Sequence, residues 1–234
     1  MKPVMQLHKL ILTLFLKCTI WFGMMGILLF AAAGDWHWPQ GWIFLAIYIL
    51  GSIVFCLWLI RRDPDLLAAR LAPLNQRGQP VWDKIFLVTF ILVWFGWLAL
   101  MGLDARRWHT SHMPAWLNWI GCAMIIAGFV ATMWVFRANS FAAPVVRLQS
   151  ERRHRVIDTG PYALVRHPMY ASALFYLIGV PLQLGSWHGL LVLPLFLAGL
   201  MPRAVMEERM LMRELSGYTD YTMRVRYRFI PGIW

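Results

Sequence analysis

Charged residues, and acidic residues above all, are scarce in this sequence. Only 14% of its 234 residues are Asp, Glu, Lys or Arg, and 11 of these are acidic against 22 that are basic. Cysteine is rarer still. Cys18, Cys56 and Cys122 lie inside apolar runs at no metal-like spacing, so we expect neither disulfides nor cysteine metal ligands. Walker, GxGxxG, GxSxG and HExxH patterns are absent, which excludes the common soluble nucleotide-binding designs.

Apolar residues take the place of the missing charge. They make up 60% of the chain, and the mean hydropathy is +0.57. Soluble domains have about half of their residues apolar. Fourteen Trp and 14 Met fit a bilayer protein with aromatic belts. We therefore expect an all-α integral membrane protein, folded as one compact helical bundle without a second large domain. The first apolar run is too long for a cleavable signal peptide, so none is expected.

Four apolar runs are long enough to cross a bilayer as helices, which takes about 20 residues. They cover residues 10–33, 41–60, 85–103 and 115–136. Two shorter runs, 171–184 and 189–201, flank a turn at 185–188. The first would reach only about 21 Å of a hydrocarbon core of about 30 Å, so we expect a tight, proline-bent helical hairpin after the four full spans. A polar helical arm then continues to about Leu215, and Gly217 ends it.

The chain divides into two parts. Residues 1–136 form an N-terminal transmembrane part, and residues 137–234 form a C-terminal region with a polar stretch, the hairpin and the arm. Within the first part, the polar loop 61–84 has leucines that alternate with Arg70 at helical spacing, which predicts an amphipathic surface helix. Lys17 interrupts the first span near its basic end, so we expect its ammonium to reach outward to the surface.

The basic residues predict the orientation. If the N-terminus is cytoplasmic, 19 of the 22 Lys and Arg residues fall in inner segments, and the outer turns carry only Arg106 and Arg107. This bias places both termini inside, in a multi-pass protein that suits a bacterial inner membrane. The net charge of +11 is then an orientation signal and not a nucleic-acid interface. His109 and His112 are three residues apart, but no further ligand cluster accompanies them, so we expect no metal.

Two polar clusters flank the hairpin. One is the segment 154–170; the other is the segment 203–209, in which Arg203 and Glu207 are four apart and share a helix face. Because a hairpin returns the chain to the side it left, the clusters meet at the cytoplasmic interface. Residue chemistry alone leaves two interpretations equally open. The clusters either form a ligand site, or they anchor lipid headgroups and make an ordinary surface pair.

The order and spacing of the C-terminal motifs decide between them, because they resemble the isoprenylcysteine carboxyl methyltransferase family. The resemblance covers about the last 90 residues; the first 140 or so resemble the family only in being transmembrane spans. The wider superfamily includes phospholipid N-methyltransferases and, more distantly, sterol reductases. The matching elements are Gln149, His154–Ile157, Gly160–Tyr162, Val165–Tyr170, Glu207–Glu208, Leu211, Leu215, Gly217–Tyr218, Tyr221 and Tyr227–Trp234.

The resemblance implies an integral membrane methyltransferase with S-adenosylmethionine as cofactor, held in a cytoplasmic pocket. Glu207 matches the glutamate that contacts the cofactor, and Arg203 matches the arginine placed near the methyl acceptor. These two are the catalytic candidates, and Arg203 is the substrate-binding one. The expected cofactor-binding set is Gln149, His154, Arg155, Val156, Ile157, Tyr162, Arg166, His167, Pro168, Met169, Tyr170 and Glu207. The upstream glutamine position aligns with either Gln149 or Arg147, and Ala171-Ser172 replaces a glycine frequent in the family.

The chemistry fits these assignments. Methyl transfer from a sulfonium is an in-line displacement, which needs positioning more than acid–base groups. Arg166 or His167 suits the cofactor carboxylate, and Glu207 suits its ammonium. We therefore expect Glu207 to lie beside Tyr162 and His167 around one small charged molecule.

The acceptor is predicted to be a lipophilic or lipidated compound from the bilayer, with an isoprenylcysteine-like carboxylate, and without metal or nucleic acid. The alternatives are a phospholipid N-methyltransferase and a non-enzymatic membrane transporter or scaffold.

Overall fold

The computed structural model describes residues 2–234, and the side chains of residues 8–234. Lys2, one of the basic residues used above for the orientation, thus has its side chain outside the described part. The described chain is helical and contains no β-strand. Its elements are α1 (Lys2–Ala33), α2 (Pro39–Arg62), α3 (Pro64–Leu71), α4 (Val81–Gly102), η1 (Leu103–Arg107), α5 (Ala115–Ala138), η2 (Ser150–Arg152), η3 (Gly160–Ala163), α6 (Pro168–Leu184), α7 (Trp187–Leu191), α8 (Leu193–Glu214) and α9 (Tyr218–Arg224).

The predicted all-α membrane fold class is confirmed, with one difference in the hairpin. Five stretches in the described part are long and apolar enough to cross a membrane: 8–33, 39–62, 81–107, 115–138 and 187–214. The hairpin arm α6 stays short, at 17 residues or about 25 Å. The other arm continues through its predicted polar part to Glu214. The difference is that residues 187–214 together are long and apolar enough to cross a membrane. Pro202 lies inside α8 and does not end it.

Local sequence signals explain most helix ends. Prolines occupy the first turn of α2, α3, α6 and α8, where the missing N–H costs no helical hydrogen bond. Asp63 caps α3 by accepting the Leu66 N–H at 2.9 Å. Leu66 and Leu67 on this helix are buried against α2, which confirms the predicted amphipathic helix. Gly217, at φ 81°, follows the end of α8 at the predicted position.

Helices α5 and α6 pack almost backbone to backbone and frame the polar end of the molecule. A Cβ added to Gly121 would lie 2.3 Å from the backbone nitrogen of Gln183, and one added to Gly179 would lie 3.0 Å from the backbone carbonyl oxygen of Gly121. At Gly128 the Tyr176 ring is 2.9 Å from such an atom. Gly121 and Gly128 therefore serve the close packing expected of small residues between membrane helices.

At the end of the bundle opposite the polar end, one buried carboxylate accepts hydrogen bonds from several segments. Asp104, with no exposed side-chain surface, accepts hydrogen bonds from the hydroxyls of Thr110, Ser111 and Ser186, and the Ser111 bond is 2.6 Å long. His188 also donates its N–H to this carboxylate at 3.3 Å. These bonds join the loop after α4 to the turn of the hairpin, which fixes α6 and α8 relative to α4.

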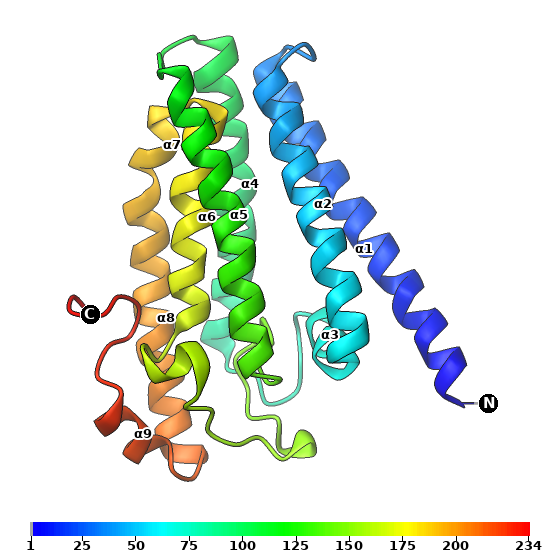
Figure 1. Ribbon diagram of the computed structural model, residues 1–234, viewed down its shortest axis with the longest axis vertical. Helices are drawn as coiled ribbons and strands as arrows, with labels where there is room; N and C mark the ends of the chain where they lie inside the picture. Colours follow the sequence, from blue (N-terminus) through cyan, green and yellow to red (C-terminus); the bar gives the residue numbers. More distant parts are fainter. Residues whose placement is uncertain (1) are drawn as a thin grey trace.

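Helices α1 and α2 lean away from the other long helices toward the end at which α3 and α9 lie (Figure 1). Lys17 on α1 extends to this end, where its ammonium donates to the Leu71 carbonyl at the end of α3. The predicted outward reach of Lys17 thus ends on a helix terminus. The same end of the molecule carries the long segment 139–167 and the C-terminal tail (Figure 1).

Candidate functional site

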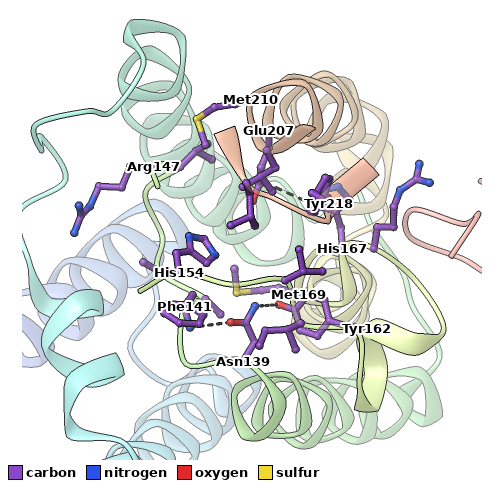
Figure 2. Close-up of a pocket in the computed structure, with 18 of the residues that line it drawn as sticks. Asn139, Phe141, Arg147, His154, Tyr162, His167, Met169, Glu207, Met210 and Tyr218 are labelled. Carbon is purple, nitrogen blue, oxygen red and sulfur yellow. Dashed lines mark hydrogen bonds and ion pairs between the residues drawn. The ribbon is translucent and has the colours of Figure 1, made fainter. Parts of the chain in front are cut away.

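A polar cavity lies at this end of the bundle, between the segment 139–167, the start of α6 and the polar half of α8 (Figure 2). It encloses about 820 Å³ when the open side is included. Of the predicted site residues, those that line it are His154, Arg155, Val156, Ile157, Tyr162, Arg166, His167, Met169, Tyr170, Arg203 and Glu207. Glu207, Tyr162 and His167 therefore lie around one cavity, as the hairpin argument requires.

Gln149 and Pro168 do not line the cavity. Gln149 is 1% exposed; its amide nitrogen donates to the Phe141 carbonyl at 2.8 Å, and its amide oxygen accepts from Arg152 at 2.8 Å. It shapes the wall and presents no free group. Pro168 is buried in the first turn of α6. Arg147, the other residue that could align with the upstream glutamine position, does line the cavity and forms an ion pair with Glu151.

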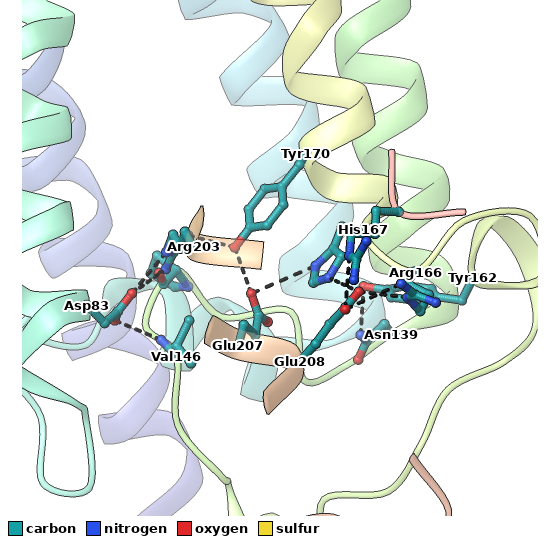
Figure 3. Close-up of polar contacts among 12 residues, drawn as sticks. Asp83, Asn139, Val146, Tyr162, Arg166, His167, Tyr170, Arg203, Glu207 and Glu208 are labelled. Atoms are coloured by element: carbon teal, nitrogen blue, oxygen red, sulfur yellow. Dashed lines mark hydrogen bonds and ion pairs between the residues drawn. The ribbon is translucent and has the colours of Figure 1, made fainter. Parts of the chain in front are cut away.

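Glu207 has one carboxylate oxygen engaged and one without a partner. The Tyr170 hydroxyl donates to Oε2 at 2.7 Å, and the His167 Nδ1 lies 3.9 Å from the same oxygen (Figure 3). No described residue forms a hydrogen bond with Oε1. The side chain is a quarter exposed and borders the cavity. A carboxylate oxygen in this position is suited to bind a cationic group of a ligand.

The neighbouring Glu208 is fully engaged. Its carboxylate accepts from the Arg166 Nε at 2.7 Å and the Arg228 Nε at 3.0 Å, and His167 Nε2 lies 3.1 Å from it. Arg166 also donates to the Val225 carbonyl at 3.0 Å. The expectation that Arg166 or His167 binds a ligand carboxylate therefore meets a competitor, since an internal carboxylate already holds both groups.

A buried ion pair that the sequence did not reveal supports α8 from the opposite side. Asp83, with no exposed surface, accepts from the Nε and Nη2 of Arg203 at 2.9 and 2.8 Å. Arg203 also donates to the Pro144 carbonyl at 2.7 Å and to the Tyr170 hydroxyl at 3.0 Å. Asp83 accepts the Val146 N–H at 3.0 Å. A chain of contacts thus runs from Asp83 through Arg203 and Tyr170 to the glutamate of the cavity (Figure 3).

The signal for Asp83 was an acidic residue at the start of an apolar span, in a chain with only 11 acidic residues. An ionised group in such a segment needs a partner. The sequence could not name that partner, because Arg203 lies 120 positions further along the chain.

The C-terminal tail closes the site. The N–H groups of Arg166 and His167 each donate, at 2.9 Å, to the carbonyls of Tyr227 and Arg228 respectively. The Phe229 ring packs against the Tyr170 ring with centroids 5.5 Å apart. The motif YRFIPGIW thus acts through its backbone, the Phe229 ring and the Arg228 guanidinium, which donates to Glu208.

Tyr162 and His154 also line the cavity, and each is held by neighbouring side chains. Asn139 at the end of α5 donates to the Tyr162 hydroxyl at 2.8 Å, and the Tyr162 carbonyl accepts from the Tyr221 hydroxyl at 2.8 Å. Burial raises the pKa of Tyr162 above its ordinary value, so the phenol stays neutral. His154 stacks on Phe141 with ring centroids 4.5 Å apart. Burial lowers the pKa of His154, which keeps its imidazole neutral near pH 7.

Two groups of opposite charge border the cavity. Glu207 offers a carboxylate oxygen, whereas Arg155 has an exposed guanidinium for which the described chain provides no hydrogen-bond acceptor. The apolar side chains of Val156, Ile157 and Leu211 border the cavity as well. The fold is thus that of an integral membrane protein, and its cavity offers both charges and apolar surface.

Comparison with known proteins supports the family resemblance. The profile of the family described as Phospholipid methyltransferase matches residues 116–217. Two probable protein-S-isoprenylcysteine O-methyltransferases of rice, from Oryza sativa subsp. indica and subsp. japonica, are each 26% identical over 112 residues, which is 47% of this chain and 59% of theirs. The protein-S-isoprenylcysteine O-methyltransferase of Dictyostelium discoideum is 25% identical over 129 residues, 53% of this chain and 50% of its own.

A nickel-cobalt-cadmium resistance protein of Alcaligenes xylosoxydans xylosoxydans, NccN, is 23% identical over 129 residues, 55% of this chain and 60% of its own. The chain therefore spans less than two thirds of the length of these relatives. Over this common region the chain is similar to protein-S-isoprenylcysteine O-methyltransferases and to the phospholipid methyltransferase family, which confirms the family resemblance.

Proposed function

We propose that this chain is an integral membrane methyltransferase that uses S-adenosylmethionine to methylate a lipophilic acceptor, with an isoprenylcysteine-like carboxylate as the accepting group. The observation that carries the proposal is the Oε1 oxygen of Glu207, which has no hydrogen-bond partner among the described residues and belongs to a side chain that borders the polar cavity. The cavity is built from the positions at which the chain resembles the family. The similarity of residues 116–217 to methyltransferases supports the reaction class.

The residues of the cavity fit the charge pattern of this cofactor. Glu207 would bind the ammonium, and Arg155 at the open edge would bind the carboxylate. Val156 and Ile157 offer an apolar wall for the adenine ring. His154, neutral and stacked on Phe141, adds a flat surface without a charge that would repel the sulfonium.

When bound, the cofactor supplies a methyl group on a positively charged sulfur, and the acceptor oxygen takes this methyl while the sulfur keeps the electron pair of the broken bond. The chain's own residues have to hold the two reactants in line and exclude water. Tyr170 is well placed for the first task, because its hydroxyl is held by Arg203 at 3.0 Å and holds Glu207 at 2.7 Å. A carboxylate acceptor needs no general base, since it is ionised at neutral pH.

An apolar groove next to the cavity supports a lipophilic acceptor. It encloses about 1660 Å³, its open side included, and is bordered by side chains from α1 to α6, among them Trp21, Phe55, Trp94 and Phe129. Helices α1 and α2 form one wall and helices α4 to α6 the other. A lipid tail could enter this groove from the bilayer without crossing water.

We also propose the orientation and the membrane. The cavity end of the molecule carries the arginines of segments 61–84, 137–170 and 203–228, which supports a cytoplasmic position for it and for both termini. A bacterial inner membrane suits a chain of this organisation.

The first test is calorimetric binding of S-adenosylhomocysteine to the purified protein in detergent, with the parent and with Glu207→Ala. We expect the parent to bind and the variant to bind at least tenfold more weakly, because a charge-assisted hydrogen bond contributes about 1.5–3 kcal/mol. Incubation with radiolabelled S-adenosylmethionine and a total lipid extract should then label a lipid. Absence of binding by the parent would refute the proposal.

The family profile also favours a second function, methylation of a phospholipid amine. The two differ in pH dependence. An amine must lose a proton before it can attack, so its methylation rate rises with pH up to the pKa of the amine, whereas a carboxylate is already ionised from about pH 5 upward. Chromatography of the labelled lipid, with the rate measured between about pH 6 and 9, separates the two.

A further inference from the structure

Arg70, on the short surface helix α3, is a partly buried cation without an anionic partner among the described residues. Its guanidinium lies 4.5 Å from the centroid of the Phe136 ring, and its Nη1 donates to the Ala142 carbonyl at 2.9 Å. Among the described residues no carboxylate lies within 4 Å of it, and its Nε and Nη2 have no acceptor. Burial lowers the pKa of Arg70 to about 10, so the group still carries its charge at neutral pH.

A partly buried charge without a partner is costly, because the protein replaces its lost hydration only in part. Arg203, the arginine expected near the acceptor, differs sharply. Each of its three nitrogens donates to an acceptor of the protein, and its charge is balanced by Asp83. Of these two arginines, Arg70 is the one with free donors.

Arg70 lies where the apolar groove meets the polar cavity. Its side chain borders the groove, whereas Ala142 and Met169, the two residues that its Nη1 contacts, border the cavity. Lys17 is a second cation on the border of the groove, and none of the described residues that border it is acidic. The groove is therefore apolar along its length and positive at the end nearest the cofactor site.

We propose that Arg70 binds the carboxylate head of the methyl acceptor, whose single apolar tail occupies the groove. This inference rests on the proposed function, which it extends by naming the residue that selects the acceptor. The Nε and Nη2 of Arg70 form a planar fork that matches two carboxylate oxygens. The carboxylate loses its charge when its oxygen takes the methyl group. Arg70 therefore holds the acid and not the methyl ester, so the same contact favours substrate binding and product release.

The chain contains its own probes for occupancy of the groove. Cys18 and Cys56 both border it, whereas the third cysteine, Cys122, is buried on α5 outside it. Purified protein is treated with N-ethylmaleimide, and modification of each cysteine is followed by mass spectrometry. The measurement is made with increasing concentrations of a prenyl thioether carboxylic acid or of its methyl ester, in the absence of any cofactor.

We expect the acid to protect Cys18 and Cys56 at concentrations about 10- to 100-fold lower than the ester does. This ratio is the gain in affinity that one charge-assisted hydrogen bond contributes. In Arg70→Gln this preference should vanish, and in Arg70→Lys it should be partly kept, because the charge remains and the fork is lost. Arg77→Gln is the matched control. It removes the same charge from an exposed position of the same loop and should leave the preference unchanged.

Kinetics give the second readout. Arg70→Gln should raise KM for the acid about 10- to 100-fold and leave the affinity for S-adenosylhomocysteine unchanged. Unchanged cofactor affinity also shows that the variant is folded. Equal protection by acid and ester in the parent, or an acid preference that survives in Arg70→Gln, would overturn the proposal. Stronger protection by a two-chain phospholipid than by the acid would overturn the choice of occupant.

The cysteine-protection experiment needs no cofactor. A negative result in it can therefore be distinguished from a failure of the proposed function. A protein that binds no S-adenosylhomocysteine but keeps the acid preference at Arg70 would be a binder of anionic lipids, not a methyltransferase. A protein that binds the cofactor and shows no acid preference would be a methyltransferase whose acceptor Arg70 does not select.

Discussion

Glu207 and Glu208 are adjacent in the sequence but have opposite environments, which makes them a matched pair for mutagenesis. Glu207 is a quarter exposed and has a free oxygen on the cavity. Glu208 is 3% exposed and is bound by Arg166, His167 and Arg228. The substitutions Glu207→Gln and Glu208→Gln remove the same charge and keep the same shape. We expect the first to affect ligand affinity and the second to affect stability.

The magnitudes follow from the contacts. Glu207→Gln keeps an oxygen that can accept from Tyr170, so the folded state loses little. The ligand loses a charge-assisted hydrogen bond, about 1.5–3 kcal/mol, and S-adenosylhomocysteine should bind about 10- to 150-fold more weakly. Glu208→Gln leaves the buried guanidinium of Arg166 and the partly exposed one of Arg228 without their counter-charge. Removing one partner of a buried ion pair typically costs about 3–5 kcal/mol of stability.

The assay is calorimetry with S-adenosylhomocysteine together with thermal unfolding, both in the same detergent. Glu207→Gln should unfold close to the parent temperature and bind weakly. Glu208→Gln should unfold at a lower temperature and, where it is still folded, bind with near-parental affinity. The reasoning is refuted if the two effects are exchanged, or if both variants lose affinity equally with unchanged thermal stability.

Three further predictions concern the frame of the site. Asp83→Asn should lower the free energy of unfolding by about 3–5 kcal/mol in thermal or denaturant unfolding, because it leaves Arg203 buried without a counter-charge, and adding Arg203→Met should recover most of the loss. Burial holds the pKa of His154 in the folded protein below its ordinary value of 6.5, so the unfolded chain takes up a proton first. The unfolding temperature should therefore fall as the pH is lowered below about 6.5, and His154→Gln should flatten this dependence. Gly121→Ala should cost at least about 1–3 kcal/mol of stability, whereas Gly96→Ala, which meets nothing within 4 Å, should be neutral or slightly stabilising; equal effects would contradict the backbone packing of α5 on α6.

Local patterns in the sequence predicted the elements well, because helix starts and ends depend on nearby residues. The amphipathic helix before Leu71 and the stop at Gly217 lie where expected. The polar helical arm expected up to about Leu215 is the second half of α8, which ends at Glu214 and borders the cavity. The length of the second hairpin arm was predicted less well, because hydropathy singled out only the apolar run 189–201, whereas the stretch of spanning length is 187–214.

The sequence predicted many of the residues that line the cavity, but not the ion pairs that they form. Of the 13 site residues named from the resemblance, 11 line the cavity. The roles of the arginines among them, however, depend on partners far away in the chain. Arg166 is held by Glu208, 42 positions away, and Arg203 by Asp83, 120 positions away. No local pattern reports which of several arginines keeps free donors. That difference, which leaves Arg70 open, requires the three-dimensional arrangement.

The two halves of the proposed reaction have different origins in the chain. The family match begins at residue 116 and covers residues 139–167, the start of α6 and the polar half of α8, which line most of the polar cavity. The groove is bordered largely by α1 to α4, which precede the match. Methyl transfer requires the accepting oxygen within about 3–3.5 Å of the methyl carbon, so the two halves have to meet at one point. Arg70 and Met169 mark that point, because each contacts the other while bordering a different cavity. Similarity over 116–217 therefore supports the cofactor chemistry, and the identity of the acceptor has to be sought in the groove.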